Sequence, residues 1–215
     1  MLGAARTGAW AKSGSPTPAA YGGLRFTAEA DNSTVQLTAV GSAPAVTLVK
    51  SFDGVNWEDY TVGEVIELPS IGDFVYLAAG EGGNETFASS SSIYNRFVIN
   101  GLVAASGDIT SLRRFDLIQT PIAERCYIGM FYGCTGLTSA PELPATTLAR
   151  NCYRYMFYGC TKLSLIKVHF TAWESQTSKW VSNVASTGTF YKPRALPEEY
   201  GANNIPTGWT VMNID

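Results

Sequence analysis

A block of twelve residues in the second half of the chain occurs twice, 26 residues apart. CYIGMFYGCTGL begins at Cys126, and CYRYMFYGCTKL begins at Cys152. A fixed period of roughly 20 to 50 residues is typical of proteins built from stacked coils, in which each unit buries its apolar face only against its neighbour. A partial upstream copy fits the same register, since Leu117 precedes Leu143 by 26 residues. We therefore expect about three stacked coils from residue 109 onward.

The composition indicates a folded chain made mainly of strands and turns. Of its 215 residues, 46% are hydrophobic and 15% are charged, with 21 glycines and 10 prolines, which is unlike a charged helical bundle. The net charge of -3 argues against nucleic acid as a partner, because phosphate binding needs clustered Lys and Arg. No run approaches the roughly 18 apolar residues of a membrane-spanning helix, so we expect no membrane insertion.

The first half of the chain has the pattern of short β-strands. From Leu24, alternating segments follow one another at close spacing: LRFTAEA, STVQLTAV, VTLVKSF, WEDYTV, EVIELP, DFVYLAA and YNRFVING. Strands of this length, separated by turn residues, are typical of antiparallel sandwiches. Asp53 and Gly54 supply the backbone conformations of a tight turn between two of these strands. We therefore predict an immunoglobulin-like β-sandwich over residues 24–104.

Residues 1–23 differ in composition, being rich in Ala, Gly, Ser and Pro with a single large side chain at Trp10. Two interpretations are open. The segment is either a disordered terminus or an extended docking tail that inserts Trp10 into a partner, as isolated aromatic residues do at interfaces. It also lacks the unbroken apolar stretch of a secretory signal, since Thr7 and Lys12 interrupt it.

Each copy of the repeat predicts one strand and one helix. Residues 137–143 are expected to form a short strand, with prolines at positions that offer no ladder donor. A helix is expected from Thr146 to Gly159, because apolar residues recur at every fourth position between these two typical helix-end residues. An equivalent helix is expected to begin at Thr120. These coils make residues 105–215 an α/β domain.

A different helix is expected to close the end of the array. Thr171 and Glu174 have the spacing of a capping box. Trp173, Trp180 and other apolar residues then fall on one side of the predicted helix. An open end of a stack exposes its core, so we expect this helix to shield the last coil.

The second half resembles the BspA-like leucine-rich repeat, in which an apolar pair followed by G-C-x-x-L closes each coil. The matching residues are Met130, Phe131, Gly133, Cys134 and Leu137, then Met156, Phe157, Gly159, Cys160 and Leu163. The closing stretch from GTFYKP to IPTGWTV also looks like the endings of repeat proteins from Bacteroides and their phages. The resemblance implies adhesion, surface display or protein recognition, with no family catalytic residues. The predicted fold class is thus mixed β and α/β, an antiparallel β-sandwich followed by a short leucine-rich-repeat solenoid.

The chain lacks the residue combinations of most catalytic sites. Its one histidine, His169, stands in the apolar run LIKVHF and is expected to be structural or at the surface. The four cysteines are eight residues apart within each copy, which matches no CxxC metal knuckle and suits small buried residues. A disulfide between Cys126 and Cys152, across adjacent coils, is left as an alternative. Walker, Rossmann, HExxH and GxSxG motifs are missing, so we predict a non-enzymatic protein with no catalytic residues, metal or cofactor.

Tyrosines recur along the predicted coils and suggest a partner-binding surface. Their rings offer a large contact area with a polar tip, which suits a protein or a sugar. The alternative is that most of them pack between neighbouring coils. The candidate partner-binding residues are Trp10, Tyr127, Tyr132, Tyr153, Tyr155 and Tyr158.

Taken together, these features suggest a structural or attachment protein of a phage virion, such as a capsid decoration, head fibre or tail appendage. A virion protein leaves its host by lysis and needs no secretion signal. The N-terminal tail would bind virion or surface proteins, and the repeat face would bind a host-surface protein or glycan. Such appendages usually form symmetric oligomers, so we expect a homo-oligomer such as a trimer. The alternatives are a bacterial cell-surface adhesin and a glycan-binding module.

Overall fold

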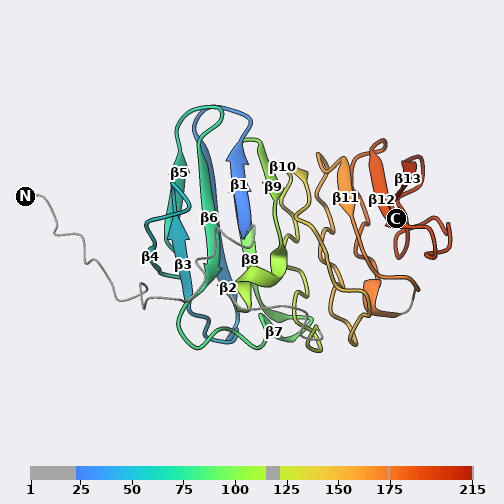
Figure 1. Ribbon diagram of the computed structural model, residues 1–215, viewed down its shortest axis with the longest axis horizontal. Helices are drawn as coiled ribbons and strands as arrows, with labels where there is room; N and C mark the ends of the chain where they lie inside the picture. The colour runs from blue at the N-terminus through green and yellow to red at the C-terminus, as the bar shows by residue number, and fades with distance from the viewer. Residues whose placement is uncertain (1–22, 115–121, 174, 215) are drawn as a thin grey trace, which may run out of the picture.

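The protein is built almost wholly from β-strands and turns (Figure 1). The computed structural model describes residues 23–114, 122–173 and 175–214. Within these ranges the only helices are two short 3-10 helices, η2 (Ile109–Leu112) and η3 (Ser175–Thr177). The expectation of a β-rich fold is confirmed, and the expectation of an α/β second half is wrong.

The strands of the described ranges form two sheets. The larger sheet has the order β13-β12-β11-β10-β9-β1-β6-β3-β4, parallel from β13 to β9 and antiparallel from β9 to β4. Its strands are β1 (Leu24–Ala28), β3 (Leu48–Ser51), β4 (Glu58–Tyr60), β6 (Phe74–Ala79), β9 (Val103–Ser106), β10 (Leu137–Ser139), β11 (Leu165–Lys167), β12 (Thr189–Pro193) and β13 (Thr210–Ile214). The smaller sheet, β5-β2-β8-β7, is antiparallel throughout. Its strands are β2 (Ser33–Val40), β5 (Val65–Leu68), β7 (Ala88–Ser90) and β8 (Ile93–Asn100).

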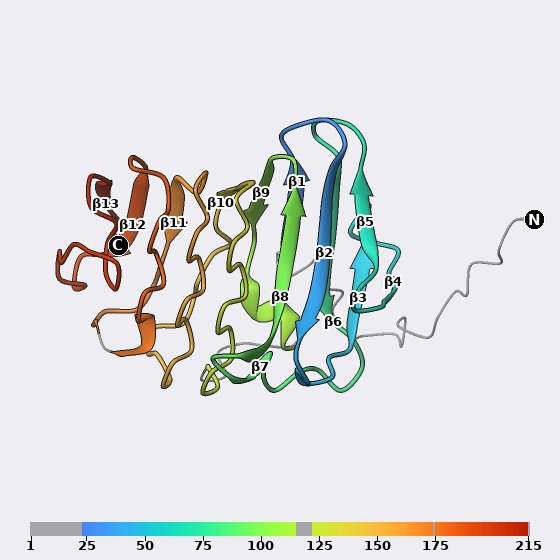
Figure 2. The ribbon, with the colours of Figure 1, turned by 180° about the vertical axis from the view of Figure 1, so that it is seen from behind.

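The two sheets pack face to face in the first half of the molecule (Figure 2). Alternate residues of β2, such as Val35 and Leu37, have no exposed surface, because successive side chains of a strand point to opposite faces. Phe26 of β1 meets Phe97 of β8 edge to face, with ring centroids 4.8 Å apart. The apolar alternation in the sequence therefore forms the core between the sheets.

The turn expected at DGVN joins β3 to β4. The Asp53 carboxylate accepts hydrogen bonds from the N–H groups of Val55 at 2.8 Å and Asn56 at 2.7 Å. The backbone bond from Asn56 is the main cause that holds the pKa of Asp53 well below its usual value. The ionised carboxylate therefore organises this loop.

Strand β9 belongs to both halves of the molecule. It pairs antiparallel with β1 through residues such as Ala105 opposite Phe26, and parallel with β10 at Val103 opposite Leu137. The predicted domain boundary between residues 104 and 105 lies inside this strand. The large sheet therefore runs without interruption from the first half into the second.

Opposite the parallel strands, each coil has a ribbon of consecutive turns. We call residues 124–133, 150–159 and 178–183 the first, second and third turn ribbons. Every second amide of the first ribbon donates to the second, such as Tyr127 N–H to the Cys152 carbonyl at 3.0 Å. The amides between them donate to the carbonyl three residues earlier in their own ribbon. The ribbons are therefore cross-linked from coil to coil by backbone hydrogen bonds.

These turn ribbons take the place of the two helices expected at Thr120 and at Thr146 to Gly159; Thr120 itself lies outside the described residues. A positive φ recurs at every fourth position of a ribbon, and an α-helix does not continue through such residues. They are Arg125, Gly129 and Gly133, then Asn151, Tyr155 and Gly159, then Lys179 and Asn183. Because the ribbon itself repeats every four residues, it buries the same positions that a helix would bury.

The expected closing helix is also absent from the described residues. Thr171 lies in an irregular segment, Glu174 lies outside the described residues, and only η3 follows them. Trp180 is fully buried, and its indole N–H donates to the Asn204 carbonyl at 2.9 Å. The array does not end there, because β12 and β13 continue the parallel sheet.

Candidate binding site

The structure divides the predicted tyrosines into two groups. Tyr127 and Tyr153 have no exposed surface, and burial raises the pKa of both phenols well above its usual value. The expectation that these two face a partner is wrong, because stacking of the coils encloses them. Trp10 lies outside the described residues. The remaining candidates are half-buried at the surface: Tyr132, Tyr155 and Tyr158.

The enclosed rings form columns that run through the core. Phe131 stacks between Phe97 of the first half and Phe157 of the next coil, with centroid distances of 5.2 and 5.5 Å. In the same way, Tyr127 stacks on Phe87 at 6.0 Å. The aromatic residues that recur in the sequence thus join the coils to each other and to the sheet pair.

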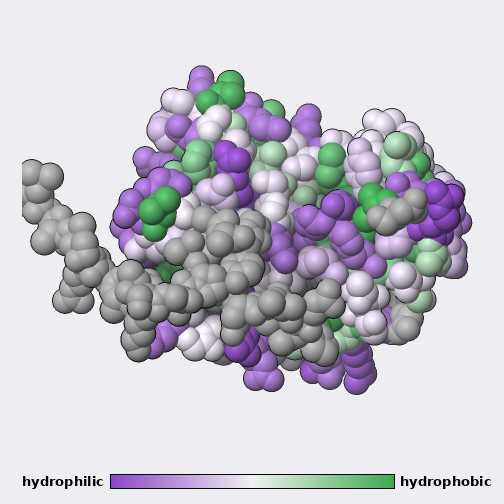
Figure 3. Space-filling view, in the orientation of Figure 1, coloured by the Kyte–Doolittle hydropathy of each residue, from purple (hydrophilic) through white to green (hydrophobic). Residues whose placement is uncertain are grey.

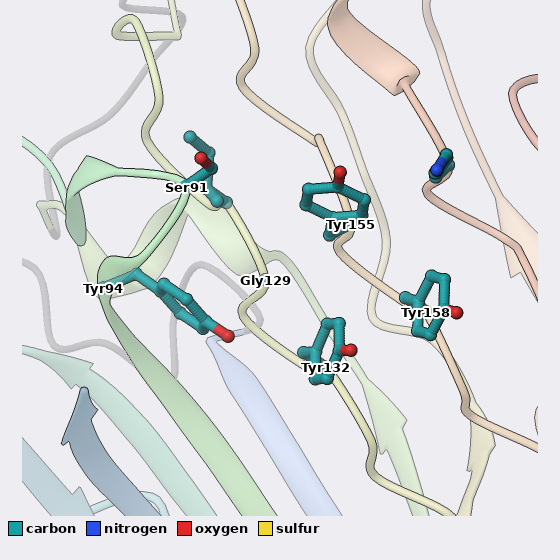
Figure 4. A pocket seen from close by; sticks show the side chains of 8 residues that line it. Ser91, Tyr94, Gly129, Tyr132, Tyr155 and Tyr158 are labelled. Carbon is teal, nitrogen blue, oxygen red and sulfur yellow. The ribbon is translucent and has the colours of Figure 1, made fainter.

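The three surface tyrosines lie close together (Figure 4). Tyr132 and Tyr158, which occupy equivalent positions on the first and second ribbons, stack with their ring planes 4° apart and their centroids 5.0 Å apart. Tyr155 approaches both rings edge to face, at 6.5 Å from Tyr132 and 6.1 Å from Tyr158. We call these three residues the tyrosine cluster.

A hollow of about 310 Å³ opens beside the tyrosine cluster. Gly129 is the first-ribbon counterpart of Tyr155, so the row of equivalent side chains lacks a member there. Tyr94 of β8 packs over Gly129, where an added Cβ would lie 2.7 Å from a carbon of the Tyr94 ring. We call this space the Gly129 hollow. Its lining includes Tyr94, Ile128, Gly129, Tyr132, Tyr155 and Lys179.

The charged groups at the Gly129 hollow are cationic. Lys179, the third-ribbon counterpart of Tyr155, lines the hollow and is exposed. The guanidinium of Arg154 lies 4.9 Å from the Tyr155 ring centroid and donates to the Tyr155 hydroxyl at 3.3 Å. That hydrogen bond is the main cause that lowers the pKa of Tyr155. Within the described chain, no carboxylate lines the hollow.

The cysteines lie in the core and are all free, so the disulfide left open between Cys126 and Cys152 does not form. Burial raises the pKa of the Cys126, Cys134 and Cys152 thiols to about 12. Thiols with such pKa values are poor nucleophiles at neutral pH. Among the described residues, no group of three or more His, Cys, Asp and Glu is arranged to hold a metal ion.

His169 belongs to a group of hydrogen-bonded polar side chains that joins two coils. Its Nε2 lies 2.6 Å from Glu142 Oε1, and Lys167 Nζ lies 2.7 Å from the same oxygen. Partial burial opposes ionisation of Glu142, but the hydrogen bonds from Lys167 and His169 outweigh it and lower the pKa of this carboxyl. This arrangement agrees with a structural role for His169.

Other exposed apolar side chains stand apart from the Gly129 hollow. Phe52, Val55 and Ile71, on loops of the first half, are 49%, 71% and 66% exposed. On the face shown in Figure 3, apolar residues are spots among polar ones. Scattered apolar side chains are normal at a protein surface. The Gly129 hollow is therefore the stronger candidate site.

The lining residues that are missing from the candidates suggested by the sequence include Gly129, Lys179 and Tyr94. Gly129 carries a signal, because the two copies of the repeat differ there and only a glycine leaves room for the Tyr94 ring. Lys179 and Tyr94 have no such signal in the sequence. Lys179 follows the repeat at a shorter spacing, and Tyr94 reaches the ribbon only through the tertiary packing of β8.

No family model, curated protein or solved structure matches this chain in comparisons with known proteins. Among the described residues, no helix is both long and apolar enough to cross a lipid bilayer.

Proposed function

We propose that this chain is a non-enzymatic attachment protein of a phage virion, serving as a capsid decoration, head fibre or tail appendage. In this proposal the first half is an immunoglobulin-like sandwich, and the second half is a short leucine-rich-repeat solenoid of the BspA-like kind. Two packed sheets support the first assignment. One parallel strand per coil, with apolar repeat residues turned inward, supports the second.

The tyrosine cluster is the observation that carries a binding function. Its backbone is held on both sides: Gly133 N–H donates to the Tyr158 carbonyl at 2.8 Å, and Tyr155 N–H donates to the Ser178 carbonyl at 3.1 Å. Rigid aromatic side chains lose little conformational entropy when a partner binds. A preorganised aromatic surface of this kind suits recognition better than catalysis.

The remaining features of the proposal concern assembly. Residues 1–23 dock on a virion or surface protein through Trp10, and the cluster faces a host-surface protein or glycan. A symmetric homo-oligomer such as a trimer would present several clusters at once and raise the overall avidity. A bacterial cell-surface adhesin is the second setting in which the same surface would serve.

Mass spectrometry of purified phage particles and of host envelope fractions tests the setting. We expect peptides of this chain in the particles, and recovery in the envelope alone would refute the virion proposal. A chain lacking residues 1–23 and a Trp10→Ala variant should both be lost from particles. Unimpaired incorporation of both would show that the tail does not dock.

An attachment assay tests the tyrosine cluster itself. The double variant Tyr132→Ala/Tyr158→Ala should bind host cells at least about tenfold more weakly than the unmodified protein, because aromatic anchors dominate interfaces. Tyr200→Ala is the matched control, since Tyr200 is 51% exposed and lies outside the cluster. Equal binding by all three proteins would exclude the cluster as the contact surface.

A further inference from the structure

The Gly129 hollow lies where the row of equivalent side chains along the ribbons is interrupted, and the Tyr94 ring packs over the bare backbone of Gly129. Tyr155 and Lys179 occupy the equivalent position on the second and third ribbons, and all three residues have a positive φ, 58°, 56° and 52° in chain order. The backbone is therefore alike at the three positions, and only the side chain differs. The hollow is lined by Tyr94 and by Tyr155.

The walls of the hollow suit a ligand that is part apolar and part hydroxylated. Four tyrosines line it, and each combines a flat apolar ring with a hydroxyl that both donates and accepts hydrogen bonds. Ile128, the aliphatic residue of the lining, is only 1% exposed. An apolar peptide side chain would thus meet no aliphatic surface there. A sugar ring, with C–H groups on its faces and hydroxyls at its edge, matches these walls.

The charges at the hollow favour an anionic ligand. Lys179 and Arg154 flank Tyr155, and the described residues place no carboxylate within ion-pair distance of either cation. By contrast, Arg125 on the first ribbon is paired with Glu124 at 3.0 Å. Lys179, which lines the hollow and has no carboxylate partner among the described residues, therefore supplies charge complementarity that a neutral sugar would leave unused.

We infer that the Gly129 hollow is a binding site for one acidic sugar residue, a saccharide ring that carries a carboxylate. The inference rests on the proposed attachment function and names its ligand class. The sugar ring lies against Tyr155 and Tyr94, and its carboxylate pairs with Lys179. The volume of about 310 Å³ is at the small end of the range for ligand pockets, about 300–1,000 Å³, as a single sugar residue requires.

Calorimetric titration of the full chain with sialyllactose and with lactose tests the inference. We expect sialyllactose to bind more tightly than lactose. Adding NaCl to about 0.5 M should reduce this difference in affinity, because salt at this concentration screens exposed charges within a few ångströms. Lys179→Ala should weaken sialyllactose binding about three- to fivefold, as expected for an exposed ion pair, and leave lactose binding unchanged. Tyr155→Ala should weaken the binding of both sugars, because both stack on the Tyr155 ring.

Lys162→Ala is the matched control, since Lys162 is an exposed lysine outside the hollow. Unchanged melting temperatures would show that Lys179→Ala and Lys162→Ala are folded. Equal binding of the two sugars, absence of binding, or equal effects of the two lysine variants would each overturn the inference. Loss of sugar binding by a protein that still attaches to cells and enters particles would leave the proposed function intact. Absence from both particles and cells would instead overturn the proposed function.

Discussion

The two buried tyrosines of the repeat permit a test in which the same substitution has opposite effects. Tyr127 and Tyr153 are equivalent in the repeat, both are fully buried, and their rings stack at 6.1 Å. The Tyr127 hydroxyl donates to the Ile109 carbonyl at 3.3 Å. The Tyr153 hydroxyl has no hydrogen-bond partner among the described residues. Replacing each tyrosine with phenylalanine removes only the hydroxyl and leaves the stacked ring in place.

The expected free-energy changes follow from these two environments. Tyr127→Phe loses a buried hydrogen bond and should lower the free energy of unfolding by about 1 kcal/mol. Tyr153→Phe removes a hydroxyl whose burial without a partner costs roughly 1–3 kcal/mol, so it should raise that free energy by about 1 kcal/mol or more. The two variants should thus differ by about 2 kcal/mol, equivalent to about 4–8 °C in melting temperature for a chain of this length.

Differential scanning calorimetry of the purified variants measures this difference directly. Urea titration provides a second measurement, in which a shifted midpoint at constant slope reports stability. The double variant tests whether the stacked residues act independently. If both single variants shift the melting temperature in the same direction, the reasoning is refuted, because the presence of a hydrogen-bond partner would then not distinguish the two hydroxyls.

Three further predictions concern the core and the coil contacts. The four cysteines should not react with a thiol reagent until the protein unfolds, and all should react in denaturant, as titration with a chromogenic disulfide checks. Gly136→Ala should lower stability by about 1–3 kcal/mol, because its Cβ would lie 2.0 Å from the Gly101 carbonyl oxygen; a melting curve measures this. Since the folded pKa of Glu142 is lowered, its stabilising contribution is present above its unfolded pKa, about 4.3, and is lost as pH falls through the folded value. The stability advantage of the unmodified protein over Glu142→Gln should therefore disappear in acid melts.

The sequence predicts neighbouring repeat units, but it does not predict that the segments opposite the parallel strands are turn ribbons and not helices. Residues 26 apart lie side by side in the structure, since Ser139 of β10 pairs in parallel with Leu165 of β11. The period of four is ambiguous, because a helical face and a ribbon of turns bury the same positions. Gly129 and Gly133, spaced by four in the first ribbon, are the residues that distinguish them, since a helix interior disfavours glycine. A positive φ at Arg125 or Tyr155 has no such signal.

The candidate site is only partly predictable from the sequence. The recurrence of Tyr132 and Tyr158 identifies surface positions, yet the same recurrence at Tyr127 and Tyr153 identifies core positions. Which face of a ribbon is enclosed depends on the neighbouring coil. The contribution of Tyr94 depends on how the smaller sheet lies beside the coils, which no local pattern encodes.

Strand β9 is the edge to which the parallel part of the large sheet is joined. The antiparallel half is synthesised first, and since β10, β11, β12 and β13 follow β9 in the sheet in chain order, we expect them to add to its free edge in that order. Each added strand then offers its own free edge to the next strand, because each repeat contacts only its neighbours. Shortening the chain from its far end should thus remove layers one at a time, whereas damage to β9 should deprive every later layer of its starting surface.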